Sequence, residues 1–435
     1  MENELASQPV EQTLNVSIEK MVYGGEGLAR TDEGVLLVPL VLPGERASVQ
    51  LQERQKGVRR GRLLEVLYAS PDRVAAECPY FARCGGCHYQ HIRYDKQLGL
   101  KKEILRESFE RIGKIRLETP ISVIASEPWH YRNRTRLQIQ KEFSRFEIGY
   151  FETLSHQICP VEICPISSPG INDALAQLAH GVGAACFPDG AAEIELLASD
   201  SDRELLATVY SSEAAPAVFG DALHSAIPSV KSVEWRQKFS PRLSPTVTNW
   251  GNGSITYHVG DHHYKVGHDS FFQINRFLPE AFIGAVVGDL EGQSVLELYA
   301  GVGYFTIPLA HRFAKVAAVE SHPASARDLA SNVGVVGDRA RAYHLTAEKF
   351  LMTASRNWDV IVANPPRGGL NKIVLEHVSR LRPQCFVYVS CDPATLVRDL
   401  GTLIRAGYRL RSVHLIDQFP QTYHIESIVH LEHTA

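Results

Sequence analysis

The sequence has no long hydrophobic run. Its longest apolar stretch, from Val35 to Pro43, is far shorter than the roughly 20 residues that a helix needs to cross a bilayer. The first residues, Met-Glu-Asn-Glu, also lack the basic segment followed by an apolar one that marks a secretory signal. These two absences predict a cytoplasmic protein that makes no contact with a membrane.

The sequence also lacks an overall excess of positive charge. A formal net charge of −4 argues against a protein that coats RNA uniformly. The basic residues are concentrated, however, because residues 51–150 carry 20 lysines and arginines against 12 acidic residues. A basic block inside an acidic chain is typical of a localised contact with a polyanion, although a solvated charged face would give the same pattern.

The eight cysteines are more informative than the charge. In a cytoplasmic protein they are expected to be metal ligands or catalytic groups rather than disulfides. Cys78, Cys84 and Cys87 are spaced Cys-x5-Cys-x2-Cys, which places three thiolates within a short loop. A fourth ligand must come from elsewhere, and Cys159 and Cys164 are the candidates. From these residues alone, a tetrahedral zinc site and an iron–sulfur cluster are equally compatible with the pattern.

The pattern of apolar and turn residues divides the chain of 435 residues into several parts, as its length requires. Residues 1–12 are expected to form a flexible N-terminus, and short alternating strands predict a small β-barrel over 13–69. Residues 70–275 are expected to form a central mixed α+β domain that carries the cysteine cluster. Over 276–435 strands alternate with helices, which predicts a Rossmann-like α/β domain with a seven-stranded sheet.

One helix is expected directly after the cysteine segment, over about 94–112. Leu98, Leu105, Phe109 and Ile112 share one face of this helix, and charged residues cover the other. We therefore expect these four side chains to face a hydrophobic core, with the lysines and glutamates in solvent.

A glycine turn follows the first strand of the expected α/β domain. Val295 to Gly303 has the pattern of a buried strand that ends in a glycine turn before a helix. Gly301 and Gly303 would let the backbone approach a ligand closely, although many α/β turns carry Gly-x-Gly. The next strand ends at Glu320, where a carboxylate can accept hydrogen bonds from two ribose hydroxyls. No Gly-x-x-x-x-Gly-Lys phosphate loop is present, which argues against binding of a nucleotide triphosphate. The single short Gly-x-Gly offers no cradle for the pyrophosphate of a dinucleotide, so S-adenosylmethionine fits this turn better.

The fourth expected strand, Val360–Ala363, is followed by Asn364, two prolines and Arg367. An Asn-Pro-Pro or Asp-Pro-Pro at this position is typical of methyltransferases, because the prolines fix φ and hold the backbone next to cofactor and target base. Outside this register the same tripeptide would indicate only a turn.

Cys391 lies at the C-terminal end of the apolar strand that begins at Cys385. Ligands bind at these strand ends in α/β sheets, so the thiol is a candidate nucleophile. Glu426, in the C-terminal segment, supplies a carboxylate that could act as a base. Considered alone, each has a plain alternative: a buried strand-end cysteine and a salt-bridged carboxylate.

Together, the thiol, the carboxylate and the glycine turn indicate covalent catalysis with a bound cofactor. A thiolate is the nucleophilic form of cysteine, and the sequence does not reveal which group generates it.

In order along the chain, these segments resemble the bacterial RNA (uracil-5-)-methyltransferases, in particular the iron–sulfur 23S ribosomal RNA type. The resemblance covers almost the whole chain. It is carried by Gly24 to Ala29 and Leu42 to Glu45, which are similar to a TRAM RNA-binding module, by the cysteine segment with Gln97 and Lys101, by Phe272 to Asn275, by the glycine turn, by the Asn-Pro-Pro-Arg segment, by Ser390 to Thr395, and by Phe419 to Ser427.

The resemblance implies an S-adenosylmethionine-dependent enzyme that forms 5-methyluridine in 23S rRNA, with Cys391 as nucleophile and Glu426 as proton acceptor. It implies a 4Fe–4S cluster held by Cys78, Cys84, Cys87 and Cys164, with a structural role. We expect a monomer that binds RNA. The residues expected at the cofactor are Gln273, Tyr299, Gly301, Gly303, Glu320 and Asn364.

Further RNA contacts can be expected from two segments. Arg132, Arg134 and Arg136 alternate on a strand-like stretch and could contact phosphate. The target uridine must leave its stack to reach Cys391, and Phe271 or Phe272 could stack on the extruded base, although such aromatic pairs more often belong to a core.

Some features leave alternatives open. The family usually carries aspartate where this chain has Asn364, and the loss of charge could weaken cofactor binding or turnover. An RNA-binding protein with lost or weakened catalysis is therefore one alternative, and transfer RNA as the substrate is another. An iron–sulfur redox protein is a third, without a flavin or nicotinamide site to support it. Glu297 in place of the commoner aspartate is a milder departure.

Overall fold

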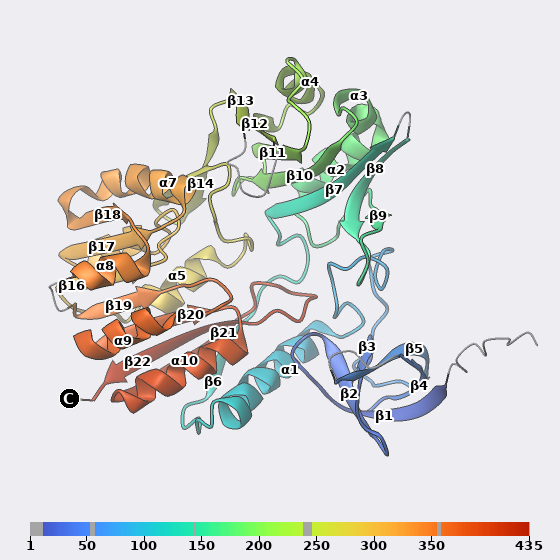
Figure 1. Cartoon of the computed structure of the whole chain (residues 1–435), viewed down its shortest axis with the longest axis horizontal. Helices are drawn as coiled ribbons and strands as arrows, with labels where there is room; N and C mark the ends of the chain where they lie inside the picture. The colour runs from blue at the N-terminus through green and yellow to red at the C-terminus, as the bar shows by residue number, and fades with distance from the viewer. Residues whose placement is uncertain (1–11, 53–56, 143–144, 238–245, 355–357, 435) are drawn as a thin grey trace, which may run out of the picture.

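The computed structural model contains a closed barrel and three sheets (Figure 1). No helix in the part of the chain that the structure describes is long and apolar enough to cross a membrane. The expected flexible segment 1–12 lies outside the described residues except for its last position. The structure describes residues 12–52, 57–142, 145–237, 246–354 and 358–434.

The N-terminal part is a closed five-stranded barrel with the strand order β1-β2-β3-β5-β4, as the strand pattern predicts. Side chains alternate between the interior and solvent, so that Val16, Ile18, Leu36 and Val49 fill a small core. The barrel strands are β1 (Thr13–Met21), β2 (Glu26–Thr31), β3 (Gly34–Pro39), β4 (Arg46–Leu51) and β5 (Arg59–Tyr68).

The central part is a seven-stranded sheet in the order β13-β12-β11-β10-β7-β8-β9, with short helices packed on it. Its core is formed by apolar side chains of both, among them Leu137, Leu175 and Trp235. The strands are β7 (Arg134–Glu142), β8 (Arg145–Phe151), β9 (Ile158–Pro160), β10 (Ala191–Ala198), β11 (Leu205–Ser211), β12 (Val230–Gln237) and β13 (Thr246–Gly251), and the helices are α2 (Pro169–Gln177), the π-helix Leu178–Val182, α3 (Gly183–Cys186) and α4 (Phe219–Ala226).

The C-terminal part is an eight-stranded sheet in the order β18-β17-β16-β19-β20-β22-β21-β6. Seven of these strands come from the region expected to form the Rossmann-like domain, which confirms that fold class. Strands β16 to β20 run parallel to one another. Strand β22, in contrast, is antiparallel to both of its neighbours, β20 and β21. The strands are β16 (Ser294–Leu298), β17 (Lys315–Glu320), β18 (Ala340–His344), β19 (Val360–Ala363), β20 (Cys385–Ser390), β21 (Tyr408–Ile416) and β22 (Glu426–His433).

Helices cover both faces of this sheet, so its strands are apolar on both sides. On β20, Phe386 and Tyr388 belong to the core on one face, whereas Val387 and Val389 belong to the core on the other. The hairpin of β14 (Ser254–Val259) and β15 (His262–Gly267) packs on the second face. The helices are α5 (Pro279–Val287), α6 (Thr306–Arg312), α7 (Pro323–Val333) with the 3-10 turn Gly334–Arg339, α8 (Ala347–Thr353), α9 (Lys372–Leu381) and α10 (Pro393–Arg405).

Two elements that precede the central sheet in sequence pack with the C-terminal sheet instead. Strand β6 (Ile121–Ile124) pairs with β21 and forms the edge of the sheet, which the sequence pattern does not reveal. Helix α1 (Tyr94–Glu107) continues into a π-helix over Ser108–Ile112 and lies between the barrel and the C-terminal sheet (Figure 1). Its apolar side chains share one core with both neighbours.

The buried face of α1 differs from the expected one. Leu105 and Phe109 are fully buried as expected, but Ile112 is 59% exposed because the π-turn rotates the last residues away from the core. The placement of Ile112 in the core was therefore wrong. The buried face includes two polar side chains, Gln97 and Lys101, so the expectation that the lysines of this helix lie in solvent was wrong for Lys101.

The burial pattern of α1 gives a stability prediction. Leu105→Ala should lower the free energy of unfolding by about 2–5 kcal/mol, because it leaves a cavity in the core that joins the helix to the sheet. The matched change Ile112→Ala should alter it by less than about 0.5 kcal/mol, as for other surface substitutions. Urea denaturation of both variants measures the difference, and equal destabilisation would contradict the exposed position of Ile112.

Candidate active site

The nucleophile and base candidates lie at the ends of two paired strands. Strands β20 and β22 are antiparallel, and their last pair is Ser390 with Ser427. Cys391 follows Ser390 and Glu426 precedes Ser427, so both residues lie directly beyond this last pair, at the same end of the sheet. They are close enough for the charge of Glu426 to act on the Cys391 thiol.

The Glu426 carboxyl group is buried, and burial raises its pKa to about 8, although Arg367 acts in the opposite direction. The Cys391 thiol has a pKa raised to about 11, first by burial and then by the negative charge of Glu426. The free protein therefore holds this thiol in its protonated form at neutral pH. A basic residue or a bound substrate must offset these effects before the thiol can act as a nucleophile.

Arg367 is the basic side chain whose charge reaches both groups. It lowers the pKa of Cys391 and of Glu426, and its own backbone carbonyl accepts a hydrogen bond from Thr395 at 3.2 Å. The sequence had identified it as part of the Asn-Pro-Pro-Arg segment but had given it no role. Its position directly after the two prolines is the signal from which that role could have been expected.

The barrel contributes an aromatic side chain to the same site. Tyr23, from the turn between β1 and β2, donates a hydrogen bond to the backbone carbonyl of Cys391 at 3.3 Å. Its ring packs edge-on against Tyr423, with 5.6 Å between ring centroids, and Tyr423 also contacts His88 and His424. The barrel turn is thus part of the wall around the candidate nucleophile.

The glycine turn after β16 has the backbone conformation that a ligand-binding turn needs. Tyr299, Gly301 and Gly303 all have positive φ angles, of 62°, 59° and 94°. A non-glycine residue such as Tyr299 rarely adopts this conformation outside functional sites. The Glu320 carboxylate accepts hydrogen bonds from the backbone N–H groups of Gly301, Ser321 and His322, at 2.8, 2.7 and 2.6 Å, which brings the end of β17 against the turn.

Four of the residues expected at the cofactor line a single cavity at this turn: Gln273, Tyr299, Gly301 and Asn364. The Gly303 N–H donates a hydrogen bond to the carbonyl of Ala300 within the turn. The Glu320 carboxylate binds the same turn by accepting the hydrogen bond from the Gly301 N–H. Both phenylalanines before Gln273 line the same cavity, but Phe272 is buried in the core whereas Phe271 is 57% exposed.

Glu297, one residue before the end of β16, also lines this cavity. Its carboxyl group is buried and its pKa is raised to about 8, mainly by burial and further by Glu320, although a hydrogen bond from the Thr306 hydroxyl acts in the opposite direction.

The four cysteines expected to bind a cluster line one cavity of about 60 Å³. Cys78, Cys84 and Cys87 come from the loop before α1, and Cys164 comes from the segment after β9. The other candidate, Cys159, lies in β9 within the core of the central sheet and does not line the cavity. The Gly86 N–H donates a hydrogen bond to the Cys84 sulfur at 3.4 Å.

The thiols surround this cavity rather than a point. Within the described residues, no three histidine, cysteine, aspartate or glutamate side chains converge closely enough to hold a single metal ion. Arg132 also lines the cavity, and its Nε is buried with no hydrogen-bond partner within the described ranges. An arginine expected at RNA phosphate thus lies beside the cysteines.

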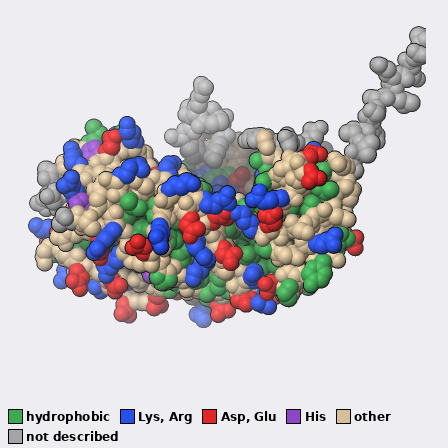
Figure 2. Space-filling model, turned by 90° about the horizontal axis from the view of Figure 1, so that it is seen from below, with side chains coloured by type: hydrophobic (Ala, Val, Ile, Leu, Met, Phe, Trp, Pro, Cys, Tyr) green, Lys and Arg blue, Asp and Glu red, His purple; other side chains and the backbone are tan. Residues whose placement is uncertain are grey.

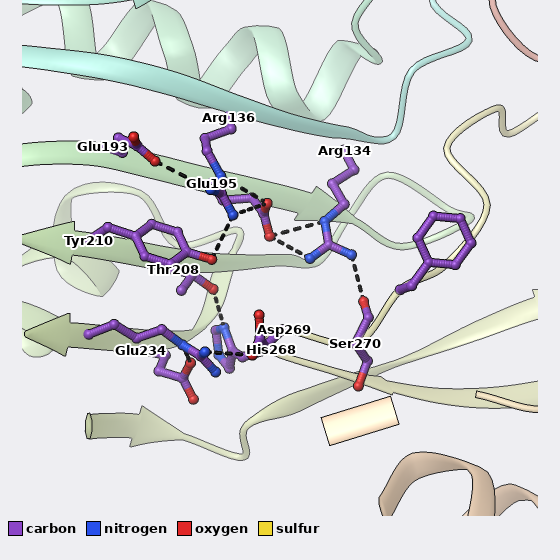
Figure 3. A network of polar contacts seen from close by, with 12 residues as sticks. Arg134, Arg136, Glu193, Glu195, Thr208, Tyr210, Glu234, His268, Asp269 and Ser270 are labelled. Atoms are coloured by element: carbon purple, nitrogen blue, oxygen red, sulfur yellow. Dashed lines mark hydrogen bonds and ion pairs between the residues drawn. The ribbon is translucent and has the colours of Figure 1, made fainter. Parts of the chain in front are cut away.

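The next two arginines of that stretch form a polar network with the central sheet (Figure 3). Arg134 and Arg136 both pair with Glu195, at 3.0 and 3.1 Å, and Arg134 also donates to the carbonyl of Ser270. Arg236 extends the network to Asp269, next to Ser270. These arginines therefore hold the segment that leads to Phe271. On the face seen in Figure 2, lysine and arginine side chains lie among acidic ones.

Comparison with known proteins agrees with this arrangement. The sequence profile described as tRNA (Uracil-5-)-methyltransferase matches residues 254–434, and the TRAM domain profile matches residues 9–64. An RNA methyltransferase of Halalkalibacterium halodurans is 31% identical, over 96% of this chain and 96% of its own. The 23S rRNA (uracil(1939)-C(5))-methyltransferase RlmD of Alkalilimnicola ehrlichii is also 31% identical, over 98% of this chain and 97% of its own.

A solved structure extends the likeness to the whole fold. The crystal structure of the Pyrococcus abyssi tRNA (uracil-54, C5)-methyltransferase in complex with S-adenosyl-L-homocysteine has a TM-score of 0.78 and 25% identity, and it covers 96% of this chain and 100% of its own. The fold is therefore that of an S-adenosylmethionine-dependent methyltransferase joined to a TRAM barrel. The chain belongs to the RNA (uracil-5-)-methyltransferase family, which confirms the family and enzyme class expected from the motifs.

The raised pKa of Glu297 gives a prediction for stability against pH. The ordinary pKa of a glutamate is 4.5, whereas that of Glu297 in the folded protein is about 8. Between these two pH values folding takes up a proton, so the stability of the folded state falls as the pH rises. Glu297→Gln removes this titration. The difference in the free energy of unfolding should shift in favour of the variant by about 1 kcal/mol for each pH unit between 5 and 8. Denaturation curves at several pH values test this, and a constant difference would show an ordinary pKa.

Proposed function

We propose that this protein methylates carbon 5 of a uridine in ribosomal RNA through a covalent bond between Cys391 and carbon 6 of the base. S-adenosylmethionine supplies the electrophilic methyl group. The observation that carries the proposal is the placement of Cys391 and Glu426 directly beyond the last pair of β20 and β22, at the sheet edge where the glycine turn after β16 also lies. The full-length likeness to RlmD of Alkalilimnicola ehrlichii supports ribosomal RNA.

The residues act in two stages. The Cys391 thiol first gives up its proton to solvent, and its sulfur then forms a bond to carbon 6 while the carbon 5–carbon 6 double bond becomes an enolate. Carbon 5 takes the methyl group from the sulfonium of the donor, which leaves as a thioether. Glu426 then removes the proton from carbon 5, the double bond re-forms, and the sulfur leaves as a thiolate. Arg367 favours the anionic form of both groups, because its charge lowers the pKa of each.

The cofactor turn supports this proposal in spite of Asn364. The side chain lines the cavity together with Tyr299 and Gln273, so its amide can still hydrogen-bond a ligand there. A neutral amide gives a weaker contact than a carboxylate. Weakened cofactor binding is therefore compatible with the proposal, whereas absent binding would favour an RNA-binding protein without catalysis.

The proposal is tested with labelled S-adenosylmethionine and unmodified RNA. Cys391→Ala should abolish both methyl transfer and the adduct, with a fall in rate of at least about 1000-fold. Glu426→Gln should still form the bond to RNA but should accumulate the methylated adduct, because the carbon 5 proton is not removed. Cys385→Ala, which changes a buried cysteine at the start of the same strand, is the matched control and should stay active.

The same assay compares ribosomal and transfer RNA. Transfer RNA is the second candidate, because the Pyrococcus abyssi structure of similar fold is a tRNA (uracil-54, C5)-methyltransferase. Methylation of transfer RNA alone would replace the proposed substrate. Transfer of label to an exocyclic nitrogen or a ribose oxygen would overturn the proposed chemistry.

We propose further that Cys78, Cys84, Cys87 and Cys164 hold a 4Fe–4S cluster. Two observations support the fit: four thiols line one cavity, and the Gly86 N–H is directed to a cysteine sulfur. The unpartnered Arg132 Nε offers a positive group beside the anionic cluster. The cluster would tie the loop before α1 to the segment after β9 and would take no part in methyl transfer.

Iron and sulfide analysis of protein purified without oxygen tests the cluster. The parent protein should contain about four of each per chain. Cys164→Ser should lose most of the iron, whereas Cys159→Ser should keep it, because Cys159 lies in the core of the central sheet. Zinc in place of iron, or equal iron content in both variants, would overturn the assignment.

A further inference from the structure

The loop between β21 and β22, from Asp417 to Ile425, ends at the proposed base Glu426 and is itself buried. A buried irregular loop must find hydrogen-bond partners for its backbone outside itself. In this loop the partners come from several other parts of the chain. They fix the path of the backbone that leads into Glu426.

Lys101 on α1 makes the strongest of these contacts. Its ammonium group is fully buried, and it donates to the Asp417 carboxylate at 2.6 Å and to the carbonyl of Phe419 at 2.9 Å. Tyr94, two turns earlier on the same helix, donates to the other oxygen of Asp417 at 3.0 Å. The first residues of the loop are thereby attached to one face of α1.

Gln97, one turn before Lys101, holds the middle of the loop. Its amide accepts a hydrogen bond from the Gln421 N–H at 3.0 Å and donates one to the Gln421 side chain at 2.9 Å. It also donates to the carbonyls of Tyr89 and Ile92, at 3.1 and 2.8 Å. Gln421 has a φ of 66°, a left-handed conformation that a non-glycine residue keeps only when its surroundings enforce it.

The remaining carbonyls of the first half of the loop are also held. Asn275 donates to the carbonyls of Asp417 and Gln418, at 3.4 and 3.3 Å, and the Tyr131 hydroxyl donates to that of Pro420 at 3.0 Å. The carbonyl of Gln421 accepts from the N–H groups of two residues that directly follow Cys87, both at 2.9 Å. Five consecutive carbonyls, from 417 to 421, therefore have partners outside the loop.

We propose that Lys101 and Gln97 are positioning residues for Glu426, and that they act on the proton-removal step through this loop. The inference rests on the proposed function. A buried ion pair adds little net stability, because loss of hydration offsets the attraction, and what it does supply is one fixed geometry. Here that geometry places the carboxyl group of Glu426 close to Cys391. Neither Lys101 nor Gln97 contacts the reacting atoms.

The proposal singles out one step of the reaction. A displaced Glu426 leaves Cys391 free to form its bond to carbon 6, and carbon 5 still takes the methyl group. The carbon 5–hydrogen bond then breaks slowly, so the carbon 6–sulfur bond is retained. The methylated adduct between RNA and protein accumulates in consequence, whereas general unfolding would lower adduct formation and release together.

Two variants and one control test the proposal. Gln97→Met removes the four hydrogen bonds of the amide without leaving a charge, and Lys101→Met with Asp417→Asn removes both charges of the ion pair together. Lys102→Met, at the neighbouring and more exposed lysine, is the matched control. Each protein is incubated with labelled S-adenosylmethionine and unmodified RNA, and adduct and free product are separated on a denaturing gel.

Both test variants should lower kcat by about 100-fold, the cost of a displacement of about 1 Å in a catalytic group. The fraction of protein trapped as methylated adduct should rise, as in Glu426→Gln, while the KM for S-adenosylmethionine stays that of Lys102→Met. An unchanged adduct fraction in Gln97→Met would overturn the proposal. If the double variant does not fold, Gln97→Met decides alone.

A separate experiment distinguishes failure of the proposed covalent mechanism from failure of the positioning role. RNA that contains 5-fluorouridine traps the adduct in the parent protein, since fluorine at carbon 5 is not removed as a proton is. A parent protein that gives no trapped adduct refutes the covalent mechanism. A parent that gives the adduct, with variants that behave as the control does, refutes only the positioning role of Lys101 and Gln97.

Discussion

The antiparallel pairing of β20 with β22 is the constraint on which the site depends. This pairing brings the two strand ends together, so that Cys391 and Glu426, 35 positions apart in the sequence, become neighbours. In a sheet that is otherwise parallel around β16 to β20, only a reversed strand can begin at the edge where the others end. The glycine turn after β16 lies at that same edge, so the expected cofactor turn and the candidate nucleophile and base are brought to one end of the sheet.

Burial of this edge sets the electrostatics. The pKa values of Cys391 and Glu426 are both raised because little water reaches them, and Arg367 offsets only part of the effect. The free protein therefore keeps a protonated thiol, which limits oxidation or alkylation of Cys391. Under the proposed mechanism, a change at the site on substrate binding has to lower this pKa before the thiol can react.

The sequence was sufficient for the sheet but not for its contacts. Strands β16 to β20 could be predicted because each is an apolar run between turn signals, and the glycine turn after β16 marked the cofactor edge. Cys164 came from resemblance, since spacing alone left Cys159 equally suitable. Lys101 could not be predicted, because its partner Asp417 is 316 positions away and periodicity assigns a lysine to solvent. The prediction that Ile112 is buried was wrong because a π-turn breaks the helical period on which it relied.

The hydrogen bond from Tyr23 to the carbonyl of Cys391 has a consequence for how such proteins can be recombined. The barrel is not an appendage on a tether, because Tyr23 from its first turn lies against Cys391 and packs edge-on against Tyr423 in the segment before Glu426. Exchanging it for the barrel of a distant homologue would alter the surroundings of Cys391, even if the grafted barrel folded and bound RNA equally well. In this architecture a change of barrel would therefore affect both the choice of RNA and the rate of the reaction.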